Sequence, residues 1–296
     1  MMQKKRWMGL VLIVSGLTGT LSARCDANAQ KLLRAYPHFL KTCSHNSIVW
    51  RDGTKMLYDD GKSKSFDRLL NHADIEDMFH YSYPQGSSGY SKTKAPSKNF
   101  DPGRIRNEAF FRKMYGNSAA QVHKNLVRIP WLNRSTGGRY RVTVTRINGV
   151  DRALAAVSDD LDRLIARKPS MKKYLVPLGG TFTWRHIAGT QRLSVHSFGA
   201  AIDINVKHSS YWRWSKGHYR YRNEIPLEIV RIFERHGFIW GGKWYHYDTM
   251  HFEYRPELLE ESAAGESPRH FPVEKHKRAN TSIQTIFHRD NTGNNF

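Results

Sequence analysis

The chain has 296 residues, of which 39% are hydrophobic and eight are tryptophan, enough to bury one substantial core and a smaller second one. This composition excludes an intrinsically disordered protein. Lys and Arg outnumber Asp and Glu by 47 to 26, and the formal net charge of +21 favours a polyanionic partner, whether nucleic acid, anionic lipid or an acidic cell wall.

The first residues have the pattern of a secretory signal peptide. A basic start, MMQKKR, precedes an uncharged and mostly apolar stretch that is followed by small residues. This stretch is shorter than the roughly 20 residues that a membrane-spanning helix needs. We therefore predict a signal within residues 1–29, cleaved after Ala23 or after Ala29, and no stable membrane insertion afterwards. Cys25 and Cys43 could form a disulfide only if cleavage follows Ala23.

Residues 30–138 are predicted to be a mainly helical N-terminal region. In SFDRLLNHADIEDMF the apolar residues fit two short helices broken near Asn71. Residues 82–103 are rich in Ser, Gly, Pro and Lys and are too long for a passive connection, so we expect a long flexible loop that is either a linker or a flap over a site. A further helix is expected in RIRNEAFFRKMYG, which ends on a glycine in the place of a C-cap.

Residues 139–258 form the second predicted region. Alternation in RYRVTVTRI predicts a strand, and Asp151 is then expected to cap an amphipathic helix. YLVPLGGTFTWRHIAG predicts one or two strands, and residues 226–236 predict a second amphipathic helix that Gly237 stops. Residues 259–296 lose apolar periodicity and are predicted to be a mobile polar tail.

The stretch SVHSFGAAIDIN places a histidine and an aspartate around a glycine. If AAIDIN is a strand, Ile202 and Ile204 face the core, whereas Asp203 faces the other side. His196 precedes Asp203 across a turn at Gly199 that could fold the imidazole over the same face. An unpaired buried carboxylate costs several kcal/mol. An imidazole and a carboxylate that converge there would be two of the three protein ligands of an open zinc site.

The stretch YDTMHFEYRP offers the third ligand, because alternation places His251 on the polar side of a strand. His196, Asp203 and His251 would leave a fourth position for water, whose pKa zinc lowers to about 7. Asp248 is a candidate base if a turn separates it from His251. Glu253 shares the face of His251 and is either a rival base or a partner that orients a ligand imidazole.

Other polar and aromatic side chains are candidates for substrate contact. Arg185, in TFTWRH, could clamp a substrate carboxylate or stabilise an oxyanion. Ser194 could bind the substrate backbone or orient its own loop. The aromatic residues of YWRWSKGHYRY could form a sugar or peptide platform, bind nucleic acid, or simply pack in the core.

The pattern SxHxxGxAxD from Ser194 to Asp203, followed by DxxH from Asp248 to His251, resembles the VanY-like D-alanyl-D-alanine carboxypeptidase and L-alanyl-D-glutamate peptidase family of zinc peptidases. These enzymes trim bacterial peptidoglycan. The similarity runs from YLVPLGGTFTWR to GGKWYHYDTMHFEYRPEL, about a third of the chain. It implies an α+β fold in which a small antiparallel sheet bears the zinc site and helices pack behind it.

The resemblance also implies a role for each site residue. His196, Asp203 and His251 would bind Zn²⁺, Asp248 would be the general base where many members have Glu, and Arg185 would bind substrate. We expect a monomeric enzyme, periplasmic or secreted, that hydrolyses an amide bond of peptidoglycan stem peptides and binds no nucleic acid.

Both the D-Ala-D-Ala bond and the L-Ala-D-Glu bond remain candidates, because both chemistries use these residues. An alternative is a non-catalytic wall-binding protein that keeps a structural metal. A secreted nucleic-acid binder is a further alternative, which rests on charge and aromatic residues alone.

Overall fold

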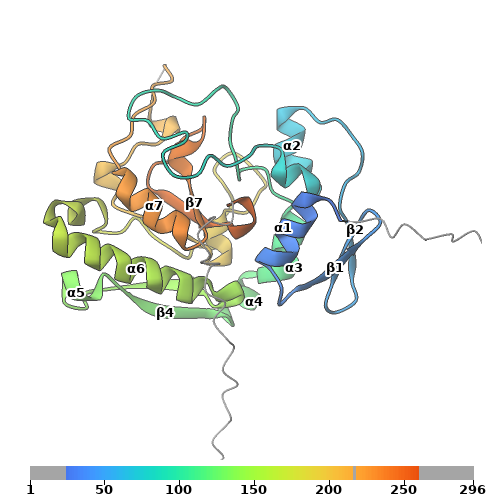
Figure 1. Cartoon of the computed structure of the whole chain (residues 1–296), viewed down its shortest axis with the longest axis horizontal. Coiled ribbons are helices and arrows are strands. Elements are labelled where there is room, and N and C mark those ends of the chain that lie inside the picture. The colour runs from blue at the N-terminus through green and yellow to red at the C-terminus, as the bar shows by residue number, and fades with distance from the viewer. Residues whose placement is uncertain (1–24, 216–217, 260–296) are drawn as a thin grey trace, which may run out of the picture.

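The computed structural model describes residues 25–215 and 218–259 (Figure 1). Most of the predicted signal peptide and nearly all of the predicted polar tail lie outside these ranges. The described part has the expected α+β fold with small antiparallel sheets. Within it, no helix is both long enough and apolar enough to cross a membrane.

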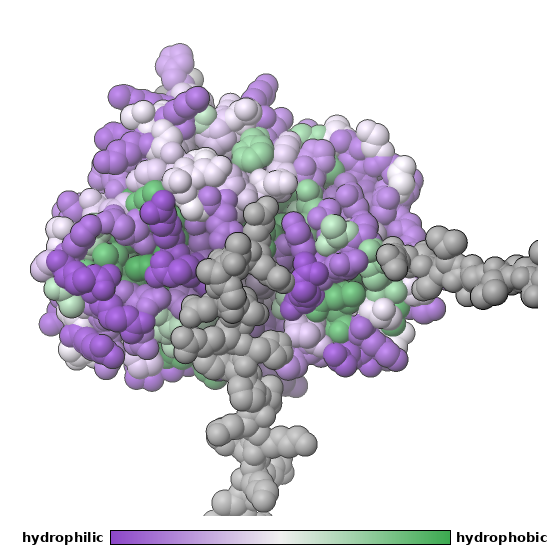
Figure 2. Space-filling model, in the orientation of Figure 1, coloured by the Kyte–Doolittle hydropathy of each residue, from purple (hydrophilic) through white to green (hydrophobic). Residues whose placement is uncertain are grey.

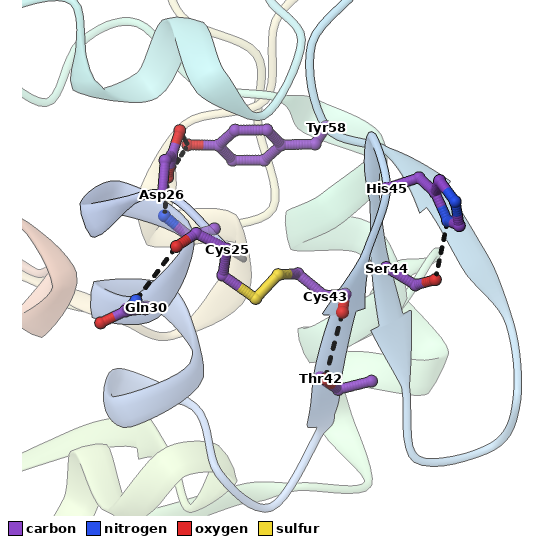
Figure 3. Close-up of a disulfide and its surroundings, with 9 residues drawn as sticks. Cys25, Asp26, Gln30, Thr42, Cys43, Ser44, His45 and Tyr58 are labelled. Carbon is purple, nitrogen blue, oxygen red and sulfur yellow. Dashed lines mark hydrogen bonds between the residues drawn. A yellow bond between two sulfur atoms is a disulfide. The ribbon is translucent and has the colours of Figure 1, made fainter. Parts of the chain in front are cut away.

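The N-terminal elements are a helix and a three-stranded antiparallel sheet in the order β1-β2-β3. They are α1 (Ala27–Ala35), β1 (Leu40–Ser44), β2 (Ser47–Trp50) and β3 (Lys55–Leu57). A disulfide between Cys25 and Cys43 joins the start of α1 to β1 (Figure 3). Asp26 caps α1 by accepting a hydrogen bond from Ala29 N at 2.6 Å. The sequence analysis did not predict this sheet in the N-terminal region.

Short helices follow; those in SFDRLLNHADIEDMF and RIRNEAFFRKMYG were predicted, whereas α4 (Ala119–His123) was not. They are α2 (Phe66–His72), the 3₁₀ turn η1 (Glu76–Phe79), α3 (Glu108–Tyr115) and α4 (Ala119–His123). The predicted break near Asn71 is confirmed by the end of α2 at His72. The predicted C-cap of α3 is Gly116, whose φ of 133° suits glycine.

Residues 82–103, expected to be a linker or a flap, form neither helix nor strand but are fastened to the rest of the protein. The hydroxyl of Tyr83 donates to Glu234 Oε1 at 2.7 Å. Lys243 Nζ, fully buried, donates to the same oxygen at 2.7 Å and to Gly86 O at 2.9 Å. Tyr90 donates to a backbone carbonyl further along the chain, Ile225 O, at 2.8 Å. A free linker is therefore wrong for this segment.

A hairpin and a long helix form the next layer. They are β4 (Leu126–Trp131), α5 (Asn133–Thr136), β5 (Tyr140–Thr145) and α6 (Val150–Arg167). The boundary predicted at residues 138/139 falls between β4 and β5, which pair with each other in antiparallel register. The N-cap of α6 is Gly149, and the predicted cap Asp151 lies inside the first turn instead.

The C-terminal elements are a helix and a second three-stranded sheet in the order β6-β8-β7. They are β6 (Ala201–Asp203), α7 (Leu227–Arg235), β7 (Phe238–Trp240) and β8 (His251–Tyr254). Phe233 of α7 stacks on Phe252 of β8 with ring centroids 3.8 Å apart, so the helix covers the apolar face of the sheet. In Figure 1, α6 lies between α7 and the β4–β5 hairpin.

The strands predicted in YLVPLGGTFTWRHIAG are replaced by isolated bridges, Gly180 with Asp203 and His186 with Leu193. Pro177 lacks an N–H group, and Gly180 has a φ of 156°, so the segment cannot continue a regular hydrogen-bonded ladder. The bridge from Gly180 to Asp203 nevertheless holds the start of this segment beside β6.

One large cluster of buried side chains runs from α1 through α6 to β8. A smaller cluster contains Tyr83, Ile239, Trp244 and Leu258, in line with the composition. The visible face of the molecule is mostly hydrophilic, with hydrophobic residues in scattered areas (Figure 2). Side chains from both sides of residue 138 thus contribute to the large cluster.

The buried pair Lys243–Glu234 should carry much of the attachment of residues 82–103. We expect Lys243→Met to lower the free energy of unfolding by roughly 3–5 kcal/mol, because it leaves the Glu234 carboxylate buried and uncompensated. Denaturant unfolding measures the change. The matched control Lys168→Met breaks an exposed pair with Glu228 and should cost under about 1 kcal/mol. Equal effects of the two substitutions would contradict this account.

Candidate metal centre

Two strands and a short turn bring the three predicted ligands together. Asp203 of β6 and His251 of β8 are directly opposed in the antiparallel register, so their side chains project on the same face. His196 lies in the 3₁₀ turn η4 (Val195–Phe198), which begins at Ser194 and ends at Gly199. Gly199 has a φ of 66°, which lets the chain reverse before it enters β6.

The ligand atoms form a compact triangle. His196 Nε2 lies 3.2 Å from Asp203 Oδ1 and 3.1 Å from His251 Nδ1, and His251 Nδ1 lies 3.0 Å from Asp203 Oδ1. Tetrahedral zinc with bonds of about 2.0–2.1 Å spaces its ligand atoms about 3.3–3.4 Å apart. The arrangement therefore fits a small divalent ion bound by two nitrogens and one oxygen.

The second nitrogen of each imidazole faces an oxygen. His196 Nδ1 contacts Thr181 O, and His251 Nε2 lies 3.1 Å from Glu253 Oε2. Because these oxygens accept hydrogen bonds, we assign the N–H of each ring to that side. The lone pairs of His196 Nε2 and His251 Nδ1 are then directed toward Asp203. Such oriented imidazoles are typical of zinc sites.

Glu253 is itself held by two arginines. Arg255 Nη1 lies 3.2 Å from Glu253 Oε1, and Arg106 Nη1 lies 3.7 Å from Glu253 Oε2. Burial raises the pKa of Glu253, but His251 and the two arginines outweigh it and lower the pKa to about 2. Glu253 therefore stays ionised in contact with His251, which is the orienting role considered for it rather than that of a base.

Asp203 and His251 stabilise each other electrostatically. Burial raises the pKa of Asp203, but His196 and His251 together hold it well below its usual range. Burial lowers the pKa of His251, but hydrogen bonds with Asp203 and Glu253 outweigh it and raise the pKa to about 10. The site therefore strongly favours a positive charge between these side chains, and a metal ion would displace a proton from it.

Asp248 lies next to this site on the turn that the sequence predicted before β8. Its backbone pairs with Tyr211, and His251 N donates to Asp248 O at 3.2 Å. Asp248 Oδ1 is buried and has no hydrogen-bond partner among the described residues. Burial raises the pKa of Asp248 to about 6, against the lowering effect of His251 and His196. A carboxylate with such a pKa can accept a proton near neutral pH.

The side chains of Arg185 and Ser194 are not part of the triangle of proposed ligand atoms. Arg185 is exposed, and its backbone is fixed by Ser197 Oγ, which lies 2.9 Å from Arg185 N. Ser194 is buried, and its Oγ accepts a hydrogen bond from His196 N at 3.4 Å. That contact is compatible with the loop-orienting role, one of the two roles expected for Ser194. The structure gives neither residue a contact with an atom of the metal ligands other than this backbone hydrogen bond.

Sequence reasoning did not identify Thr181, Arg106 or Arg255 as parts of the site. Thr181 contributes a backbone carbonyl, which any residue would provide, so the sequence carries no signal for it. Arg106 precedes the ligands by about ninety residues. Only the folded chain shows the pairing of Arg106 with Glu253.

Gly199 couples the fold to the metal ligands, because a Cβ there would lie 2.8 Å from Leu126 Cδ2 and 2.9 Å from Thr145 N. We expect Gly199→Ala to lower the melting temperature and to weaken zinc binding by displacing His196. Gly137→Ala is the matched control, since Gly137 has a similar φ of 63° but open space around it. Gly137→Ala should lower the free energy of unfolding only by the strain of placing an alanine in the left-handed region, about 1–2 kcal/mol. Calorimetry and zinc titration measure both effects, and unchanged zinc affinity in Gly199→Ala would contradict the coupling.

Comparison with known proteins identifies part of the chain. Residues 188–254 match the family model described as D-alanyl-D-alanine carboxypeptidase. The match contains His196, Asp203, Asp248 and His251, whereas Arg185 lies just before it. Neither a curated protein nor a solved structure matches the chain.

Proposed function

Because residues 188–254 belong to the VanY-like D-alanyl-D-alanine carboxypeptidase family, we propose that the protein is a zinc-dependent peptidase that hydrolyses an amide bond in peptidoglycan stem peptides. The observation that carries the proposal is the triangle of His196, Asp203 and His251 beside Asp248, whose buried Oδ1 has no hydrogen-bond partner in the part of the chain that the structure describes. Ligands and base are both needed for hydrolysis, whereas a structural metal needs ligands alone.

His196, Asp203 and His251 would hold the metal. Two imidazoles and one carboxylate are a ligand set that catalytic zinc uses. Bound zinc would supply a Lewis acid and a water of lowered pKa. His196 donates its Nδ1–H to Thr181 O, and His251 donates its Nε2–H to Glu253. These hydrogen bonds keep both rings in the tautomer that can bind a metal.

The side chains of the protein would move the proton and hold the substrate. Asp248 accepts a proton from the attacking water as the water oxygen bonds to the carbonyl carbon. It then donates that proton to the leaving amine as the carbon–nitrogen bond breaks. Arg185 binds a substrate carboxylate or the developing oxyanion. The family description favours the D-Ala-D-Ala bond, and the L-Ala-D-Glu bond is the second candidate.

The disulfide and the charge support an extracytoplasmic location, periplasmic or secreted. A bond between Cys25 and Cys43 suits an oxidising compartment. Cleavage of the signal after Ala23 would retain this bond, whereas cleavage after Ala29 would cut within α1. The net charge of +21 suits an anionic cell wall. We propose that the enzyme acts there as a monomer.

Chelation tests the metal dependence and the substrate together. Purified protein is incubated with muropeptides, with and without a chelator, and the products are weighed by mass spectrometry. We expect hydrolysis that the chelator abolishes and added Zn²⁺ restores, and the product masses identify the bond. Binding of muropeptides without cleavage in either condition would favour the wall-binding alternative.

Asp248→Asn tests the proposed base. We expect kcat to fall by about 10²- to 10⁴-fold, because the amide cannot accept the proton. Zinc content should be unchanged, since Asp248 is not a proposed ligand. Asp160→Asn, which makes the same chemical change in a residue paired with His236, serves as the control and should keep full activity. Full activity of Asp248→Asn would rule out this role.

A further inference from the structure

The β4–β5 hairpin lies within a stretch of the chain that has no acidic side chain. Residues 109–150 contain eight lysines and arginines and neither Asp nor Glu. Arg112 and Lys113, at the start of the stretch, pair with Glu108 and Asp52. The other six are exposed and form no salt bridge with a described residue; they are Lys124, Arg128, Arg134, Arg139, Arg141 and Arg146. The hairpin and its flanks therefore carry an uncompensated positive charge.

Two of these arginines lie on one face of the hairpin. Arg128 of β4 is directly opposite Thr143 of β5. Arg141 is directly opposite Pro130 in the same antiparallel register. Because side chains alternate along a strand, all four of these side chains lie on one face, where the two arginines are diagonal neighbours. The guanidinium of Arg141 donates to Arg128 O at 3.2 Å. Val142, on the opposite face, is buried, and that face packs on α6 (Figure 1).

The same face contacts the candidate metal centre at the other end of the hairpin. Leu126 shares this face with Arg128, two residues further along β4. Leu126 Cδ2 lies so close to Gly199 that a Cβ there would be only 2.8 Å away. On β5, Thr145 N donates to Gly199 O at 3.0 Å. Gly199 ends the turn that carries His196. The turn of a proposed ligand therefore packs against one end of the face, and the exposed arginines lie beyond it.

A second contact joins β5 to the site. Thr143 N donates to Thr181 Oγ1 at 3.3 Å, and the carbonyl of Thr181 contacts His196 Nδ1. Arg141 precedes Thr143 by two residues, about 7 Å along the strand. A ligand with a single carboxylate needs no such extended surface beside the metal centre, whereas a polymer with repeated carboxylates can contact both places at once.

We propose that Arg128 and Arg141, together called the arginine face, bind carboxylates of the peptidoglycan polymer next to the stem peptide that is cut. The inference rests on the proposed function and adds to it that the substrate is the polymeric wall rather than its released fragments. A guanidinium pairs with a carboxylate through two parallel hydrogen bonds, and several such pairs together hold a polymer more tightly than one pair alone. Continuity with the metal centre favours this polymer over a membrane or a nucleic acid, because neither of those has a second attachment at the centre.

Pelleting with purified sacculi tests the arginine face and requires no cleavage. Zinc-loaded protein is mixed with native sacculi, or with sacculi whose carboxylates have been converted to amides, and the bound fraction is measured at increasing salt concentration. We expect binding to native sacculi that weakens as salt rises, and much weaker binding to amidated sacculi. The double substitution Arg128→Gln and Arg141→Gln should weaken binding to native sacculi by about 5- to 30-fold. Arg128→Lys with Arg141→Lys, which keeps both charges, should recover most of the loss.

Arg163→Gln with Arg235→Gln is the matched control, because it removes the same net charge from two exposed arginines that pair with Asp160 on α6. It should leave sacculus binding unchanged. Thermal unfolding and zinc content are recorded for every variant. Equal binding to native and amidated sacculi, or equal losses in the two double glutamine variants, would overturn the inference.

Vesicles containing phosphatidylglycerol and duplex DNA are parallel probes. If the glutamine variant of the arginine face loses binding to one of these and not to sacculi, the inference is overturned and the face belongs to that partner. Sacculus binding that depends on the arginine face, in a protein that cleaves no muropeptide, would support the inference and count against the proposed peptidase.

Discussion

The direct opposition of Asp203 and His251 across β6 and β8 is the constraint on which the site depends. These strands are short, and a slip of either strand by one residue would turn its side chain to the other face of the sheet, away from its partner. The register is fixed by the apolar residues between and beside them, above all Phe252, which stacks on Phe233 of α7. The packing of a helix on one face of the sheet therefore determines which polar side chains meet on the other.

The polar contacts behind His251 extend this constraint to the opposite end of the chain. Glu253 contacts His251, Arg255 pairs with Glu253, and Arg255 Nε donates to Glu257 Oε1 at 2.5 Å. Tyr36, just after α1, donates to Glu257 Oε2 at 2.5 Å. All of these side chains are buried, so each carboxylate has a cation or a donor that compensates its burial. The residue that follows the N-terminal helix is thus connected to a proposed metal ligand, His251, through continuous polar contacts.

Patterns within short stretches of sequence, such as apolar spacing, predicted the elements whose formation depends mainly on those stretches. The helices α6 and α7 follow from apolar spacing, and the turn between Asp248 and His251 was required if both were to face one site. The prediction of strands around Gly180 was wrong, because the backbone near Pro177 and Gly180 forms only isolated bridges. Asp101 could not be placed, because its contact with His246 joins residues far apart in sequence. The contact of Thr181 could not be predicted from side-chain patterns, because it is made by a backbone carbonyl.

The core that runs from α1 to β8 includes elements on which the fold of the family-matched segment depends. Residues 188–254 contain the ligands and the proposed base, yet α6 and the β4–β5 hairpin that cover their apolar side chains come earlier in the chain. Excised from the protein, that segment would present its hydrophobic interior to water and would have no Arg106 to balance Glu253. The part of the chain that must fold together is therefore larger than the matched segment, because residues 188–254 need covering elements from earlier in the chain.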